Sequence, residues 1–268
     1  MDKPAFDYEL EIIDGIDSTN NEAKRRISER EYPRPFVIAA HYQTAGRGRQ
    51  GRSFYSPKDT GIYLTLVRPF DCPVAGQVGI TTRTAVAVAR AVELQFGVTP
   101  QIKWVNDLYL GGRKICGILC EAVNDYAADR FKYAVIGVGV NVNTAVFPAD
   151  IADRAGCIRA GRMSDEEFEA FARNIAEQIL LATDDLSDPA YLDYYRKHSL
   201  VLGREITFTE DGTEYRARAV DIDADGSLVV ELLSGAASDG ETPGDAQKEE
   251  MSSANIRRLG SGEISVRI

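Results

Sequence analysis

Arg47, Arg49 and Arg52 are interleaved with glycines in the stretch TAGRGRQGRSFYSP, which spans residues 44–57. An arginine can hold a carboxylate or a phosphate through two parallel hydrogen bonds, and glycines let a loop change its conformation around such an anion. The glycine spacing also matches G-x-G-x-x-G, but in a dinucleotide-binding turn that pattern has to open a helix. Residues 53–61 carry serines, a proline and a glycine without a helical apolar period, so we interpret the stretch as a basic anion-binding loop. The alternative is a solvated basic loop that binds nothing.

A lysine, an asparagine and an aspartate stand close together in KWVND, residues 103–107. The charge of Lys103, the amide of Asn106 and the carboxylate of Asp107 could together bind phosphate and Mg²⁺. Each residue also has a simpler explanation, because a lysine among apolar residues often extends along a sheet edge to water and aspartate is common in turns. The chain has no G-x-x-x-x-G-K-[ST] motif, so ATP would need an unconventional phosphate site of this kind. With only two histidines, no serine–histidine–acid triad is evident.

Three glycines interrupt apolar strand sequences further along the chain. Gly137 and Gly139 stand two residues apart in GVGVNVN, residues 137–143, so they point to the same face of a strand. Gly117 interrupts another strand sequence, KICGILCE, residues 114–121. The missing side chains leave room for a flat ligand on that face. The competing interpretation is a helix that packs closely on the sheet at the same positions.

The elements that would carry these residues alternate between strand and helix patterns. Two helices are expected to begin at capping boxes, one formed by Thr19 and Glu22 and one by Ser164 and Glu167. A tight turn at Gly111 and Gly112 predicts a hairpin. The expected strands lie at 36–40, 62–67, 102–110 (broken by a polar turn), 114–123 and 131–144, and the expected helices at 19–30, 78–97, 164–183 and 188–198.

The sequence pattern changes after Leu202. Apolar and polar residues alternate, with turn sequences at Asp211-Gly212 and Asp225-Gly226, which predicts a small antiparallel β domain. Residues 235–254 are rich in small, polar and acidic residues and are expected to form a mobile surface loop that the site does not need. We therefore expect two domains, an α/β domain at 1–200 and a small β domain at 201–268.

The composition is that of a soluble globular protein, with 44% apolar and 27% charged residues in a chain of 268. The net charge of −10 argues against a surface that binds nucleic acid or an anionic membrane as a whole. No apolar run approaches the roughly 20 residues that span a bilayer, and the first residues lack the apolar segment of a signal peptide, so a cytoplasmic location is expected. The four cysteines form no C-x-x-C pair, and we interpret them as small buried apolar residues in a reducing compartment.

Six segments stand in the order of the motifs of biotin protein ligases, and the chain resembles that family. They are DSTN (17–20), QTAGRGRQGR (43–52), KWVNDL (103–108), KICGILCE (114–121), GVGVNVN (137–143) and SGEISVR (261–267). The family usually has tryptophan where Phe54 stands and proline where Val105 stands, and its Thr-Ser-Leu stretch is not evident around residues 155–161. The resemblance implies an α/β fold, with a mixed-sheet catalytic domain of the biotin/lipoate ligase type and a small C-terminal SH3-like β-barrel.

The resemblance also implies a reaction, in which biotin is converted with ATP and Mg²⁺ to biotinyl-AMP and then attached to a lysine. The implied partner is the biotin carboxyl carrier domain of a biotin-dependent carboxylase. By the matching motifs, Lys103 and Arg49 are implied to be catalytic, Asn106 and Asn141 to bind the nucleotide and Asp107 to bind Mg²⁺. The residues implied to bind biotin or biotinyl-AMP are Ser18, Thr19, Asn20, Gln43, Arg47, Gly48, Arg49, Lys103 and Gly117.

Two other functions stay open at the level of the sequence. One is a lipoate or octanoate ligase on the same fold, and the other is a nucleotide-binding regulatory module without turnover. A Rossmann oxidoreductase is disfavoured by the missing helix after the basic loop. Repressor-type relatives carry an N-terminal helix-turn-helix domain, whereas about 17 residues precede the Ser-Thr-Asn motif here, so we expect no DNA binding. The sequence leaves the oligomeric state open, a homodimer included.

Overall fold

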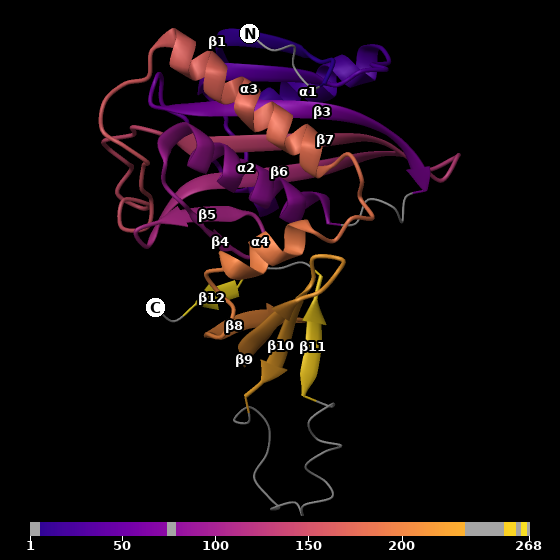
Figure 1. The fold of residues 1–268 in the computed structure, drawn as a ribbon, viewed down its shortest axis with the longest axis vertical. Coiled ribbons are helices and arrows are strands. Elements are labelled where there is room, and N and C mark those ends of the chain that lie inside the picture. The colour runs from indigo at the N-terminus through magenta and orange to yellow at the C-terminus, as the bar shows by residue number, and fades with distance from the viewer. Residues whose placement is uncertain (1–5, 74–78, 234–254, 261–263, 267–268) are drawn as a thin grey trace, which may run out of the picture.

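The computed structural model describes residues 6–73, 79–233, 255–260 and 264–266. Its strands form a seven-stranded mixed sheet and a five-stranded antiparallel sheet, with α4 (Tyr191–Lys197) between them (Figure 1). This arrangement confirms the expected α/β fold with a small C-terminal β unit. The division into domains at residue 200 stays a prediction, and the loop expected at 235–254 lies outside the described residues.

The mixed sheet has the strand order β1-β2-β3-β7-β6-β5-β4. β1 and β2 pair in parallel, and the other neighbours pair antiparallel. The strands are β1 (Glu9–Ile16), β2 (Phe36–Gln43), β3 (Gly61–Pro73), β4 (Gln101–Lys103), β5 (Asp107–Leu110), β6 (Arg113–Asp125) and β7 (Arg130–Asn141).

The strands expected from the sequence are all present, and β5 and β6 form the expected hairpin through Gly111 and Gly112. Both glycines have positive φ, 57° and 77°, as a tight hairpin turn requires. β1 is not among the strands expected above. Its acidic residues obscure the apolar alternation, which an edge strand tolerates because one of its sides has no neighbouring strand.

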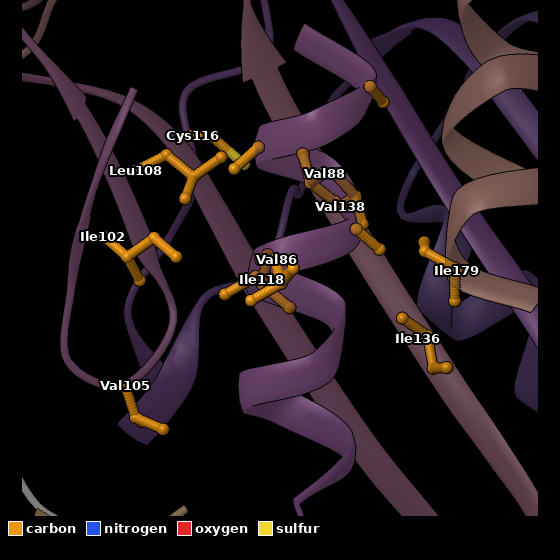
Figure 2. Packing of buried hydrophobic residues seen from close by; sticks show 14 of the residues in the cluster. Val86, Val88, Ile102, Val105, Leu108, Cys116, Ile118, Ile136, Val138 and Ile179 are labelled. Carbon is orange, nitrogen blue, oxygen red and sulfur yellow. The ribbon is translucent and has the colours of Figure 1, made fainter. Parts of the chain in front are cut away.

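Helices cover both faces of the mixed sheet, and all four expected helices are present. α2 (Ile80–Phe96) and α3 (Asp165–Ala182) pack on one face over the main hydrophobic core. Figure 2 shows part of this core, in which Val86 of α2 and Ile136 of β7 lie among the labelled side chains. α1 (Thr19–Glu29) packs on the other face over a smaller cluster that includes Ala23. The face under α1 is therefore less completely filled by apolar side chains.

The two expected capping boxes have different outcomes. At α3 the box is confirmed, because the Ser164 hydroxyl accepts from the backbone N–H of Glu167 and the Glu167 carboxylate accepts from that of Ser164. At α1 the expectation was wrong, because the N-cap residue is Ser18, and no side-chain cap bond is found there in the described chain. Thr19 lies in the first turn of the helix, and its hydroxyl bonds to Gln43 instead.

The second sheet has the order β11-β10-β9-β8-β12. Within the described residues its edge strands β11 and β12 do not pair with each other, so the strands form an open sheet and not the closed barrel implied above. The strands are β8 (Glu205–Glu210), β9 (Thr213–Ile222), β10 (Leu228–Leu232), β11 (Ile256–Leu259) and β12 (Ile264–Val266). No helix in the described part of the chain is long and apolar enough to cross a bilayer.

Polar contacts join the mixed sheet and α4 to the second sheet. The indole N–H of Trp104 donates to the carbonyl of Gly226 at 3.0 Å, which ties the turn after β4 to the turn between β9 and β10. Nε of Arg196 on α4 donates to Oδ1 of Asp221 at 2.7 Å. Because Trp104 lies two residues before Asn106, its bond to the second sheet also holds the polar turn that carries Asn106 and Asp107.

Candidate active site

One row of opposed residues crosses four strands of the mixed sheet. Lys103 on β4 pairs with Asp107 on β5, Asp107 pairs with Gly117 on β6, and Gly117 pairs with Gly139 on β7. Residues directly opposite one another in an antiparallel sheet point to the same face. The face is the one that carries α1, so Lys103 and Asp107 lie on the same surface as the glycines.

Lys114 belongs to the same face and was not predicted. Strict alternation along β6 would place it opposite to Gly117, but the register between β5 and β6 skips Ile115, which makes this residue the extra one of a β-bulge. As a result Nζ of Lys114 lies 2.7 Å from Oδ1 of Asp107. The lysine stands in the quoted segment KICGILCE, but only the bulge shows where its side chain points.

The glycine face is covered by side chains of the protein itself. A methyl group at Gly137 would lie 2.1 Å from Oδ1 of Asn20, so α1 packs very closely there. At Gly139 and Gly117 the nearest atoms belong to the ring of Phe54, at 2.4 Å and 3.1 Å. The interpretation as a close helix contact therefore holds for Gly137, whereas the flat group over Gly117 and Gly139 is the ring of Phe54.

Fixed hydrogen bonds connect the N-terminus of α1 to the end of β2. Oε1 of Gln43 accepts from the backbone N–H of Thr19 at 2.9 Å and from its hydroxyl at 3.2 Å. Nε2 of Gln43 donates to Oγ of Ser56 at 3.0 Å. The Thr65 hydroxyl lies 2.6 Å from Oδ1 of Asn20 and 2.8 Å from Oγ1 of Thr19. A buried group of oriented donors and acceptors suits a small polar ring.

The basic loop folds onto both of these regions. Nη1 of Arg49 donates to Oδ1 of Asn106 at 3.3 Å, and Nη1 of Arg47 donates to Oδ1 of Asn21 on α1 at 3.1 Å. Between strands β2 and β3 the loop forms only a short 3₁₀ turn, Arg49–Gly51, so it lacks the helix of a dinucleotide-binding turn. The loop therefore lies between the start of α1 and the polar turn after β4.

A pocket lies where these elements meet. It brings together residues that are far apart in the sequence and come from α1, the basic loop and strands β2, β3, β6 and β7. Its lining consists of Ser18, Thr19, Asn20, Gln43, Arg47, Phe54, Leu64, Gly117, Leu119, Gly137, Val138 and Gly139. Four other predicted residues lie beside this pocket, on the row of opposed strand residues or on the basic loop: Arg49, Lys103, Asn106 and Asp107. Gly48 is held in the loop because its backbone N–H donates to the carbonyl of Arg52 at 2.7 Å.

Known proteins match the chain over both of its sheets. The model of the biotin/lipoate A/B protein ligase family matches residues 12–141, and that of the biotin protein ligase C terminal domain matches residues 201–267. The bifunctional ligase/repressor BirA of Bacillus spizizenii is 30% identical over 238 residues, which cover 84% of this chain and 70% of that protein. The chain belongs to the biotin protein ligase family.

A further relative and a solved structure are also similar to the chain. The biotin–[acetyl-CoA-carboxylase] ligase of Mycobacterium tuberculosis is 27% identical, and the alignment covers 84% of each chain. Among solved structures, the biotin protein ligase from Aquifex aeolicus in complex with biotin and ATP has a TM-score of 0.69 at 22% identity, over 97% of this chain and 98% of that chain. This likeness shows the fold.

Two departures from the biotin protein ligase family pattern lie beside the pocket. Phe54, where the family usually has tryptophan, keeps an aromatic ring over Gly117 and Gly139. The peptide bond between Trp104 and Val105 is cis, at the position where the family usually has proline.

Asn106 and Asn141, the residues implied to bind the nucleotide, are both held by backbone groups. Nδ2 of Asn106 donates to the carbonyl of Ile118 at 2.8 Å, which fixes the turn to β6. Nδ2 of Asn141 donates to the carbonyl of Gly156 at 3.1 Å. Within the described structure the buried Oδ1 of Asn141 has no hydrogen-bond partner, so it is an acceptor that a ligand could use. The nucleotide contacts of Asn106 and Asn141 stay predictions.

The predicted Mg²⁺ ligand Asp107 is held by a cation of the protein. Its carboxylate pairs with Lys114, and the described residues contain no cluster of three or more potential metal ligands. Mg²⁺ usually binds through one or two carboxylates together with substrate phosphates, so a single aspartate beside a phosphate site fits the ion. The assignment of Asp107 to Mg²⁺ stays a prediction. The ion would either share the carboxylate with Lys114 or take the place of Lys114 beside it.

The cysteines near the site lie on the opposite face of β6. Cys116 is fully buried in the main core, and Sγ of Cys120 lies 3.9 Å from Oγ1 of Thr84 on α2. Burial raises the pKa of Cys120 to about 11 and that of Cys116 further, so both thiols are protonated at neutral pH. They serve as packing groups, as the sequence indicated.

Proposed function

We propose that the protein activates biotin with ATP to give biotinyl-AMP and then transfers biotin to a lysine of a biotin carboxyl carrier domain. One arrangement supports this function above all. A small hydrogen-bonding pocket at the start of α1 is covered by the Phe54 ring, and a group of cations, Arg49, Lys103 and Lys114, lies beside it around Asn106 and Asp107. Such a site offers polar contacts to a ring at one end and positive charge to a carboxylate and phosphates at the other.

In the first step, a carboxylate oxygen of biotin forms a bond to the α-phosphorus of ATP, and the bond to the leaving pyrophosphate breaks. Negative charge concentrates on the phosphate oxygens as the reaction proceeds. Lys103 and Lys114 project from strands and are therefore placed before the substrates arrive, so they stabilise that charge without reorganisation. Mg²⁺ bound with ATP adds further positive charge to the phosphates.

In the second step, the unprotonated amine of the carrier lysine attacks the acyl carbon, an amide bond forms and AMP leaves. Biotinyl-AMP is a mixed anhydride, which water would hydrolyse if the site stayed open. The basic loop contacts both α1 and the turn after β4 through Arg47 and Arg49, so it is placed to cover the intermediate.

The first half-reaction provides the test. Incubation of the purified protein with biotin and Mg·ATP is expected to give biotinyl-AMP by mass spectrometry together with biotin-dependent release of pyrophosphate. Lipoic acid under the same conditions is expected to give no lipoyl-AMP at a comparable rate. A folded protein that produces neither pyrophosphate nor a biotinyl-AMP peak contradicts the proposal.

The partner and the compartment follow from the same chemistry. We propose the carrier domain of a biotin-dependent carboxylase as the acceptor, because the second step requires an exposed protein lysine. We also propose a cytoplasmic location, since the reaction consumes ATP. We propose no DNA partner, because neither step involves a nucleic acid.

A further inference from the structure

Glu121 lies on the glycine face of β6, beyond the pocket, and has no role in the function proposed above. It follows Gly117 and Leu119 with a spacing of two residues, so it points to the same side of the sheet. Its Oε2 accepts from Nδ2 of Asn20 at 2.9 Å, and its Oε1 lies 2.9 Å from Nζ of Lys24. The same Oε1 lies 3.5 Å from Nη1 of Arg47.

The charge of this carboxylate is well stabilised. Burial raises the pKa of Glu121, but hydrogen bonds from Lys24 and Asn20 and the charge of Arg47 outweigh that effect, so the pKa lies below its ordinary value. The side chain is 24% exposed, which leaves the ion pairs less screened than pairs at the open surface. Glu121 is therefore an anion at neutral pH, and its contacts to Asn20, Lys24 and Arg47 hold the side chain in one position.

Glu121 helps to orient one of its three partners, Asn20. An amide can present either its oxygen or its NH₂ group to a neighbour, and the two ends of Asn20 have different partners. Its NH₂ group donates to Glu121, and its oxygen accepts from the Thr65 hydroxyl at 2.6 Å. Gly137 allows this position, because a methyl group there would lie 2.1 Å from the amide oxygen. Together with the carbonyl of Leu119, which accepts from the same NH₂ group at 3.4 Å, Glu121 thus holds the NH₂ end of this pocket-lining amide toward β6.

A second partner, Arg47, connects Glu121 to the basic loop. Arg47 also donates to Asn21 on α1 at 3.1 Å, so its guanidinium lies between α1 and β6. Asn20 and Arg47 both line the pocket but come from different elements. Glu121 is the group that both of them contact.

We propose that Glu121 is a positioning residue for the acid substrate. It holds the Asn20 amide and the Arg47 end of the basic loop in place before the substrate binds. The proposal rests on the proposed function, because it concerns how biotin enters that pocket. It predicts that the neutral side chain of Glu121→Gln weakens biotin binding and loosens the loop. The chemical step itself is affected little, because the cations beside the phosphates are retained.

Three variants separate this role from a simple structural contact. Glu121→Gln removes the anion. Lys24→Met breaks the ion pair between α1 and β6 but leaves the contacts of Glu121 to Asn20 and Arg47 intact. Glu22→Gln is the matched control, since it changes the net charge equally on α1, where Glu22 pairs with Arg25 and Arg26.

Two measurements are made on each full-length variant. Hydrogen exchange of the loop peptides is followed without ligand, and adenylate formation is measured in single turnovers at a series of biotin concentrations. Glu121→Gln is expected to raise the biotin concentration for half-maximal rate about tenfold with the maximal single-turnover rate within about threefold, as loss of hydrogen bonds to a charged group predicts. It is also expected to speed exchange at residues 44–53. Lys24→Met and Glu22→Gln should leave both readouts near those of the parent protein.

The proposal is overturned if Glu121→Gln behaves like Glu22→Gln, or if Lys24→Met is as damaging as Glu121→Gln. If Glu121→Gln does not fold, Glu121→Asp keeps the charge but draws the carboxylate back by one methylene group. It should show both effects to a smaller extent, and unchanged biotin affinity and loop exchange in folded Glu121→Asp would also overturn the idea. A parent protein that binds no biotin would instead contradict the proposed function, while the exchange result without ligand would still test the loop contact.

Discussion

At the scale of single residues, Arg49 and Lys103 carry the same charge but lie on different kinds of element, a loop and a strand. Arg49 lies on the basic loop, and Lys103 ends a strand. We expect Arg49→Ala to form biotinyl-AMP but to release it, because the loop no longer closes firmly over the intermediate. Lys103→Ala should form little adenylate, since loss of one preorganised contact typically costs about 10²–10³ in rate. Free biotinyl-AMP and single-turnover adenylate formation are measured together, and equal leakage with equal rates would refute this division.

Lys114 leads to a second prediction at this scale. Lys114→Met keeps the length and the apolar stem of the side chain, but it removes the cation that lies 2.7 Å from Asp107. We expect adenylate formation to fall about 10²-fold, because one positive charge is missing beside the phosphates. The control is Lys132→Met, another strand lysine, which pairs with the exposed Glu31. Similar single-turnover rates for the two variants would show that Lys114 is only a surface charge.

At the scale of elements, Arg83 of α2 holds the segment that follows α3. Its guanidinium is buried, donates to the carbonyls of Leu186 and Asp188 at 2.7 Å and 2.6 Å, and lies 4.2 Å from the centre of the Tyr191 ring. We expect Arg83→Met to lower the free energy of unfolding by about 3 kcal/mol, because two hydrogen bonds from a buried charged donor are lost.

Urea unfolding measures this change, with Arg90→Met as the control on the same helix. Arg90 is exposed and lies 5.0 Å from the centre of the Tyr194 ring, so its replacement should cost less than about 1 kcal/mol. Equal losses for the two variants would mean that the carbonyl contacts of Arg83 contribute little.

At the scale of the whole molecule, Trp104 links the two sheets. Trp104→Phe keeps an aromatic ring in the core but removes the donor to the carbonyl of Gly226. We expect a loss of about 1–2 kcal/mol in the free energy of unfolding. We also expect slower adenylate formation, because the turn with Asn106 and Asp107 loses its support. Urea unfolding and single-turnover assays test the two effects. A destabilised variant with a normal rate would show that the contact between the sheets stabilises the fold but does not contribute to adenylate formation.

Local signals in the sequence were sufficient for much of the fold. The Gly111-Gly112 turn, the Ser164–Glu167 capping box and the alternation after Leu202 each act within a few residues of the chain, and the structure contains all three features. The basic loop was also placed correctly between two strands, because the residues after it lack a helical period. These features follow from backbone conformation and from hydrogen bonds between near neighbours, which the sequence encodes directly.

The sequence by itself determined the residue types and motifs of the site, whereas the tertiary structure decided which side chains meet. Lys114 reaches Asp107 only because a bulge at Ile115 reverses the alternation of β6. Phe54 covers Gly117 and Gly139, and Glu121 contacts Asn20, through pairings between residues more than 60 positions apart. Such contacts depend on strand register and on how a helix packs against the sheet, and a single residue of register shift turns a side chain to the other face.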